Sequence, residues 1–283
     1  MAEIANAHFS GFLIELPDDL DNNVIDHAVY TAGRMQDQRL LTTRVSKLAN
    51  PSLQSACSLA LREYGESALY DLDTGLSSPA TGRQEKLLII DVVREIGGVR
   101  GKELLLLHIN DESPELQHQI YVALATLHYQ SDPDDQYIFG HKIEEEVQVV
   151  TALLADMEDL YEVEEYALVH AALGNELDVR RDNMLLLISF LYPSIVMLDT
   201  RANIDLKVSE VRTFALEVLD NLLTADIKQI VLPLLDDLTV AERLEELFSK
   251  FPQDQLSLQE RLMRSWKPTL TPRFTGPKVA CCI

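Results

Sequence analysis

The stretches SACSLALREYG at residues 55–65 and LIIDVVREIGG at residues 88–98 decide the fold, because each is an amphipathic helical pattern that ends at a glycine. The closing glycine recurs at a constant interval, at Gly33, Gly65 and Gly97, and the next position of the series is Tyr129. Glycine at the end of a helix readily adopts the left-handed backbone conformation that stops it. This periodicity predicts a protein built from repeats.

The apolar side chains keep the same phase in every copy. Five and four residues before each position of the series stand Ala28 and Val29, Ala60 and Leu61, Val92 and Val93, and Leu124 and Ala125. A second short helix follows each glycine, with leucines at equivalent positions in Leu40, Leu72 and Leu104, and a polar turn ends the unit. A single helix pair cannot bury its apolar face alone, so the pairs have to stack.

We therefore predict an all-α fold, an α-solenoid of HEAT-like helix pairs that becomes irregular in the C-terminal half. The motifs of tetratricopeptide and ankyrin repeats, whose periods are about 34 and 33 residues, are absent. The unit is similar to a short HEAT repeat. The alternative is a helical bundle in which the glycine spacing is a coincidence.

The composition favours long helices and argues against several other classes. Of the 283 residues, 47% are hydrophobic, which is too apolar for a disordered acidic chain. Only 11 Gly and 11 Pro are present, too few for the turns of a β-sandwich or barrel. With 46 Asp and Glu against 24 Lys and Arg, the net charge of −22 argues against binding to nucleic acid or to anionic membranes.

The sequence predicts a cytoplasmic protein. The first Lys or Arg is Arg34, so the positive start of a signal peptide is absent. The uncharged run at 184–198 is shorter than the 20 or so residues that span a bilayer, and Pro193 interrupts it. The cysteines are Cys57, Cys281 and Cys282, which is not a disulfide framework. Cys57 is expected to be an inert residue of the apolar core.

Five segments are predicted along the chain. They are a lead-in at 1–22, regular HEAT-like repeats at 23–129, a polar linker at 130–137, an irregular helical continuation at 138–266 and a basic, Pro-containing tail at 267–283. In the continuation, one long helix is expected from Ile138 to Leu173, with its acidic residues, among them Glu146 and Asp156, on a solvated face. Pro193 should stop a helix, and Thr239 with Glu242 should form a capping box.

No catalytic, cofactor-binding or metal-ligating residue is predicted. His141 and His170 have no ligand partner in helical register, and QSDPDDQ at 130–136 lacks the Gly and closing Glu of a calcium loop. Arg180 and Arg181 are the densest basic pair of the helical region. We interpret this pair as a solvated helix end rather than a phosphate clamp.

Four stretches together resemble a known family. These are ALREYGESALYDL (60–72), VVREIGG (92–98), RRDNMLLLISFLYP (180–193) and ALEVLDNLLTADIKQIVLPLLDDLTVAERL (215–244). They are similar to the HEAT-repeat domain attached to bacterial nucleotide-transporter-like membrane proteins of the ATP/ADP translocase type. The resemblance extends from Asn23 to Leu247 and is most specific from Phe214 to Leu244.

The resemblance implies a non-enzymatic scaffold, an accessory or regulatory module that binds a protein partner or the adjoining transporter domain at the inner face of the membrane. It transfers no motif residue, and this chain contains no transporter helices. One alternative is a nucleotide or small-molecule sensor for an attached transporter. Because short HEAT repeats also occur in bilin lyases, a second alternative is an enzyme of that kind, although no nucleophile elbow or Gly-rich phosphate loop is present.

Overall fold

The structure, a computed structural model, describes residues 54–111, 113–160, 167–204 and 209–253, together with Val45, Leu48, Asn50 and Pro51. Within these ranges every element is helical, which confirms the predicted all-α class. The expected lead-in at 1–22, the repeat that ends at Gly33 and the tail at 267–283 lie outside the described residues. The chain divides into two compact units, 1–129 and 130–283.

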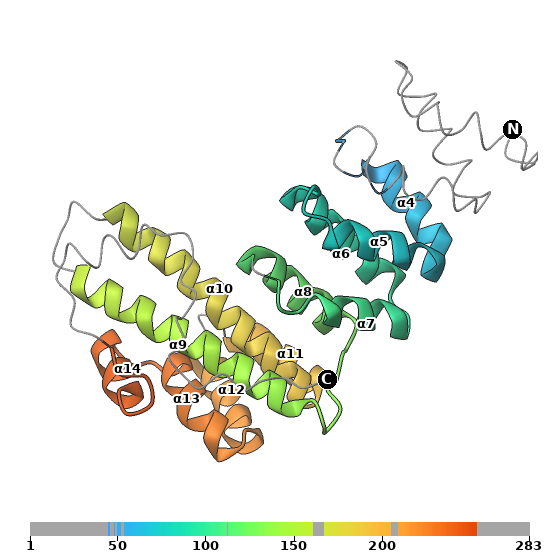
Figure 1. Cartoon of the computed structure of the whole chain (residues 1–283). Coiled ribbons are helices and arrows are strands. Elements are labelled where there is room, and N and C mark those ends of the chain that lie inside the picture. Colours follow the sequence, from blue (N-terminus) through green and yellow to red (C-terminus); the bar gives the residue numbers. More distant parts are fainter. Residues whose placement is uncertain are drawn as a thin grey trace, which may run out of the picture. The chain divides into compact units, whose positions relative to one another are not determined.

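The first unit places equivalent helices next to each other. Its elements are α4 (Gln54–Tyr64), the short 3-10 helix η4 (Gly65–Ala68), α5 (Leu69–Ser77), α6 (Arg83–Ile96), α7 (Gly98–Leu107) and α8 (Pro114–Thr126). The first helices of successive pairs are in contact, α4 with α6 and α6 with α8, and the second helices α5 and α7 also touch (Figure 1). The α4–α5 pair therefore packs against the α6–α7 pair through both of its helices.

The core of this unit repeats with the period of the sequence. Cys57, Ile89 and Tyr121 hold equivalent, equally spaced positions on α4, α6 and α8, and each is 2% exposed or less. The apolar pairs predicted for the three described repeats are all buried, as are Leu72 and Leu104 of the second helices. Burial of each large apolar side chain of this set, such as Ile89 or Leu72, stabilises the fold by about 1.5–3 kcal/mol.

The helix stops lie where the glycine series places them. Gly65 and Gly97 have φ values of +57° and +65°, and the Gly97 N–H donates to the Val93 carbonyl at 2.9 Å. In the third described repeat, which lacks glycine, His128 takes the positive φ of 51°, one residue before Tyr129. The Tyr129 N–H then donates to the Leu124 carbonyl at 3.0 Å, which closes the helix end without a glycine.

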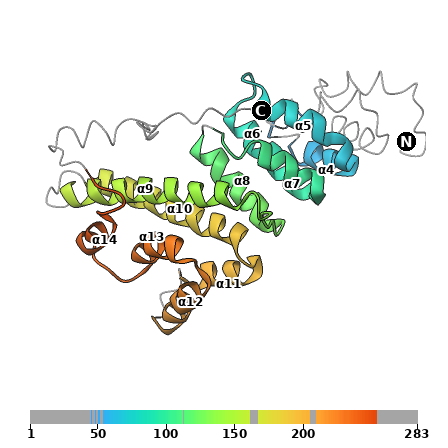
Figure 2. The same cartoon turned by 60° about the horizontal axis from the view of Figure 1, so that its bottom comes forward.

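The second unit consists of α9 (Gln136–Leu160), α10 (Ala167–Leu191), α11 (Ser194–Ile204), α12 (Ser209–Leu222), α13 (Ala225–Leu235) and α14 (Val240–Leu247). The long helices α9 and α10 run side by side (Figures 1 and 2). Phe139 and Phe190 pack edge to face between them, with ring centroids 5.5 Å apart. Each helix contacts the next, and α13 and α14 also contact α9 (Figure 2).

Two predicted boundaries in this unit are confirmed and one prediction is wrong. α10 ends at Leu191, just before Pro193. In the capping box, the Thr239 hydroxyl accepts from the Glu242 N–H at 3.3 Å, and the Glu242 carboxylate accepts from the Thr239 N–H at 2.8 Å. The single helix expected from 138 to 173 is instead two helices, α9 and α10, that pack on each other. The apolar periodicity is the same in both, so it did not reveal the break.

Gly97→Ala tests the glycine stop. A Cβ at Gly97 would combine a positive φ with a ψ of −143° and would lie 3.3 Å from the Leu127 side chain. We expect a loss of about 1–3 kcal/mol in the free energy of unfolding, measured by urea denaturation. The control is Gly140→Ala within α9, where a Cβ meets nothing within 4 Å and should stabilise by about 0.5–1 kcal/mol. Equal effects of the two changes would contradict this account.

Candidate functional site

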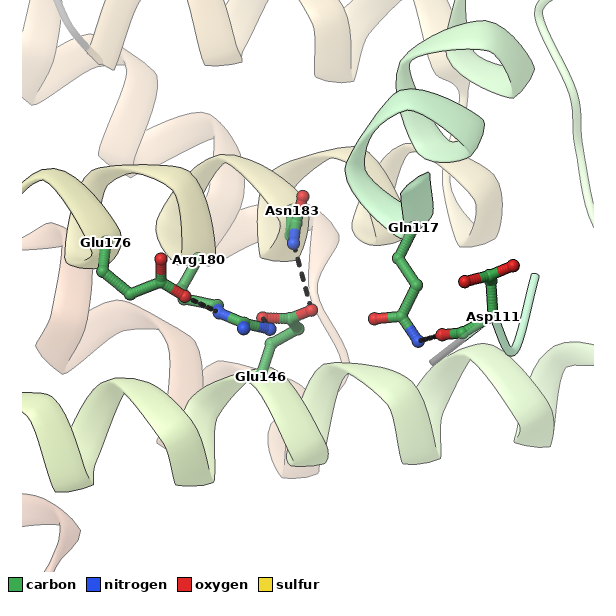
Figure 3. Close-up of polar contacts among 6 residues, drawn as sticks. All are labelled: Asp111, Gln117, Glu146, Glu176, Arg180 and Asn183. Carbon is green, nitrogen blue, oxygen red and sulfur yellow. Dashed lines mark hydrogen bonds and ion pairs between the residues drawn. The ribbon is translucent and has the colours of Figure 1, made fainter. Parts of the chain in front are cut away.

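A cluster of ionisable and polar side chains lies between α9 and α10, and we call it the α9–α10 cluster. Its members are Lys142 and Glu146 from α9, and Glu176, Arg180 and Asn183 from α10. Figure 3 shows the last four pointing toward one another across the two helices. Glu146 is 5% exposed and Asn183 is fully buried, so the centre of the cluster is shielded from water.

The contacts in the cluster occupy both oxygens of the Glu146 carboxylate. Asn183 Nδ2 donates to Glu146 Oε1 at 3.1 Å, and Arg180 Nη1 donates to Glu146 Oε2 at 3.3 Å. Arg180 Nε donates at the same time to Glu176 Oε1, one turn away on the same helix, at 2.7 Å (Figure 3). The Arg180 guanidinium therefore bridges two carboxylates and ties α10 to one position along α9.

Burial dominates the electrostatics of this cluster. It raises the pKa of Glu146 above the ordinary 4.5, although Arg180 and Asn183 pull in the opposite direction. It lowers the pKa of Lys142 below the ordinary 10.5, although Glu145 and Glu146 favour the charged form. Two acids and two bases compensate one another, so the cluster presents no net charge to a ligand. These contacts join α9 to α10 and hold the two helices in one register.

Two sequence interpretations are corrected by this cluster. Glu146 and Asp156 were expected on a solvated acidic face, but both are buried because α10 and later helices pack on that side of α9. Arg180 was expected at a solvated helix end, but it lies inside α10 with its guanidinium largely buried. Its neighbour Arg181 lies 3.9 Å from Asp178 instead, so the two arginines do not form a shared basic surface.

Three arginines of the second unit follow a spacing that the sequence analysis missed. Arg181, Arg212 and Arg243 are equally spaced along the chain, on α10, α12 and α14. Arg212 Nη2 donates to the Leu235 carbonyl at 2.9 Å, and Arg243 Nη2 donates to the Asp236 carbonyl at 3.0 Å. Burial lowers the pKa of Arg243, and the nearby charges of Arg181 and Arg212 lower it further. Equal spacing of three like residues is the clue that would have revealed this group.

Two of these arginines, Arg212 and Arg243, neutralise the end of a helix. The carbonyls that Arg212 and Arg243 bind belong to the C-terminus of α13, where the helix dipole is negative. Arg212 lies 3.9 Å from Asp237, and Asp220 pairs with Lys228 at 2.9 Å.

In the first unit, some of the polar contacts lie at helix ends. α8 begins at Pro114, and the hydroxyl of its N-cap residue Ser113 makes no capping hydrogen bond. Asp111 instead makes two hydrogen bonds at the start of this helix. Its carboxylate accepts from the Ser113 N–H at 2.8 Å, and its carbonyl accepts from Gln117 Nε2 at 2.6 Å (Figure 3). His108 Nε2 contacts Asp73 Oδ1 at 2.8 Å, which links α5 to the end of α7.

The remaining residues of interest belong to surface or core. His141 is exposed on α9, 3.7 Å and 3.5 Å from Glu144 and Glu145, and His170 lies on α10. Cys57 is buried in the core, as predicted. Among the described residues, no three His, Cys, Asp or Glu side chains come together in a way that could hold a metal ion.

Comparison with known proteins adds no assignment. No protein-family model matches the chain, and no curated protein matches it significantly. In the ranges that the structure describes, none of the helices combines the length and the apolar character needed to cross a bilayer.

Glu146→Gln tests whether the α9–α10 cluster holds the second unit together. The change removes the buried carboxylate charge that pairs with Arg180. We therefore expect a loss of about 3 kcal/mol in the free energy of unfolding, measured by urea denaturation. The double variant Glu146→Leu/Arg180→Met removes both charges. Its loss of unfolding free energy should be much smaller than the sum of the losses caused by Glu146→Leu and Arg180→Met alone. Glu144→Gln, an exposed neighbour on the same helix, is the control and should stay within about 0.5 kcal/mol of the wild type. A Glu146→Gln variant as stable as this control would refute the role.

The lowered pKa of Lys142 predicts a pH dependence. Between its folded pKa and 10.5, the unfolded chain still binds a proton that the folded chain has lost. The wild type should therefore gain stability relative to Lys142→Met as the pH rises from the lowered pKa of Lys142 toward 10.5, measured as unfolding free energy at several pH values. Gln148→Met on the same helix introduces no change in charge and should follow the wild type. Parallel curves for wild type and Lys142→Met would contradict the prediction.

Proposed function

We propose that the chain is a non-enzymatic HEAT-like scaffold that binds a protein partner or a neighbouring membrane-transporter domain. The observation that carries this proposal is the contact between equivalent helices of the first unit, α4 with α6, α6 with α8 and α5 with α7. Stacking of this kind builds a solenoid, in which each pair adds surface rather than closing a pocket. Proteins with this architecture use their extended surfaces for recognition.

The second unit supports the same interpretation. The starts of α11 and α13 are separated by the same interval as the starts of α12 and α14, and the arginines at 181, 212 and 243 keep that spacing. A repeat of helix pairs accounts for all of these intervals. The contacts of α13 and α14 with α9 add a feature that simple single-file stacking lacks. We take the second unit as a modified continuation of the repeat.

Exposed apolar side chains on the second helices supply a binding surface. Tyr70 on α5 and Val99 and Leu107 on α7 are 79%, 71% and 75% exposed. Isolated apolar residues are common on protein surfaces, but large ones repeated on the same helix of successive pairs favour an interface. The nucleotide-sensor alternative has less support, because the Arg180 guanidinium is already shared by Glu146 and Glu176.

Affinity purification from the native cells tests this function. The wild-type chain should bring down a protein at near-equal stoichiometry, and Tyr70→Ser/Leu107→Ser should reduce its recovery by at least about fivefold, since burial of these side chains drives association. Ile195→Ser removes a similarly exposed apolar residue from a first helix, α11, and should leave recovery unchanged. Circular dichroism establishes that each variant is folded. Absence of any stoichiometric partner, or equal losses in both variants, would refute the proposal.

A further inference from the structure

We propose that the exposed face of α12 around Phe214 binds a basic amphipathic segment of a partner protein, an inference that rests on the proposed scaffold function. Glu210, Phe214, Glu217 and Asn221 make up this face, which we call the α12 stripe. Their spacing of four, three and four residues places them on one side of the helix. All four are exposed, and Phe214 is 64% exposed at the centre.

The rest of α12 shows that this face is not part of the core. Ala215 and Leu219, also four residues apart, are buried on the other side of the helix, and α12 makes its main contacts with α11 and α13. With 64% of its surface exposed, Phe214 packs little against the part of the second unit that the structure describes. Aromatic side chains of this kind are enriched at the centres of protein interfaces, where a partner removes them from water.

The charges of the stripe specify the partner. Among the described residues, neither Glu210 nor Glu217 forms an ion pair, whereas Asp220 at the edge is neutralised by Lys228. Glu210 and Glu217 are seven residues apart, about two helical turns or 10 Å. The matching segment carries Lys or Arg groups about 10 Å apart on either side of an apolar side chain that covers Phe214.

The net charge of the chain favours this occupant over others. A second copy would bring another net charge of −22 and the same acidic stripe, so self-association through this face is opposed by repulsion. An anionic lipid surface is repelled in the same way. A basic segment is attracted, and its association rate should fall as salt screens the charges. Because α12 has only 14 residues, the expected interaction is small and transient.

A synthetic peptide provides the test. The probe is a fluorescein-labelled amphipathic helix of about five turns with leucines on one face and lysines on the other. Binding to the full chain is followed by fluorescence anisotropy at about 50 and 300 mM salt, and the wild type should bind the probe more weakly at high salt. Phe214→Ser and Glu210→Gln/Glu217→Gln should each weaken binding by at least about fivefold.

Matched controls separate the stripe from general acidity. Phe248→Ser removes an aromatic side chain of similar exposure, 61%, and Glu245→Gln/Glu246→Gln removes two exposed charges from α14. Both should bind the probe within about twofold of the wild type. A peptide with glutamates in place of the lysines should not bind. If circular dichroism shows that Phe214→Ser is unfolded, the test rests on Glu210→Gln/Glu217→Gln, whose binding of the probe should still be weakened by at least about fivefold.

Several results would overturn the proposal. They are no binding of the lysine peptide by the wild type, equal weakening in the α14 controls, or a dimer in sedimentation that Phe214→Ser abolishes. If only Tyr70→Ser/Leu107→Ser loses binding of the peptide, the α12 stripe is not the binding site, and the proposed scaffold function is unaffected. If the wild type neither binds the peptide nor recovers a partner protein, the α12 stripe and the scaffold function are both refuted.

Discussion

In the first unit, apolar side chains are buried where neighbouring helices pack on one another, α4 on α6, α6 on α8 and α5 on α7, and the proposed stacking of helix pairs depends on these contacts. The layer formed by Cys57, Ile89 and Tyr121 is the clearest case, since these residues are equivalent in sequence and all three are removed from water. The glycine and His128 stops follow from it, because each first helix has to end where the second can turn back onto the same layer. In the proposed scaffold, recognition would use the outward faces of the second helices, where Tyr70 and Leu107 are exposed.

The second unit adds charged contacts to apolar stacking. Glu146, Arg180 and Asn183 lock α10 to one register on α9, while Arg212 and Arg243 bind the carbonyls at the end of α13. Buried charges of this kind stabilise little by themselves, since removing them from water costs nearly as much as their attraction returns. Their contribution is specificity, because alternative registers would leave a buried charge alone. The chain thus combines an acidic exterior with an interior in which buried charges are paired.

Part of this structure could be predicted from the sequence, for identifiable reasons. Gly65, Gly97 and the apolar phase around them follow local rules of helix geometry, and their predicted positions were right. Glu146 and Arg180 were misplaced because periodicity distinguishes an acidic face from an apolar one but does not say whether another helix will cover the acidic face. The left-handed His128 was unpredictable, since nothing in its residue type requires a positive φ. The equal spacing of the three arginines was visible in the sequence but was not used. No site residue was predicted, and the α12 stripe emerges only from the observed exposure of Phe214.

Native-state hydrogen exchange on Ile89→Ala tests the stacking claim most directly. The change removes most of a fully buried side chain from α6 and should cost about 2–5 kcal/mol. If each pair depends on its neighbours, amides of α4 and α8 will lose protection together with those of α6. Loss of protection confined to α6, with α4 and α8 unchanged from the wild type, would contradict the account.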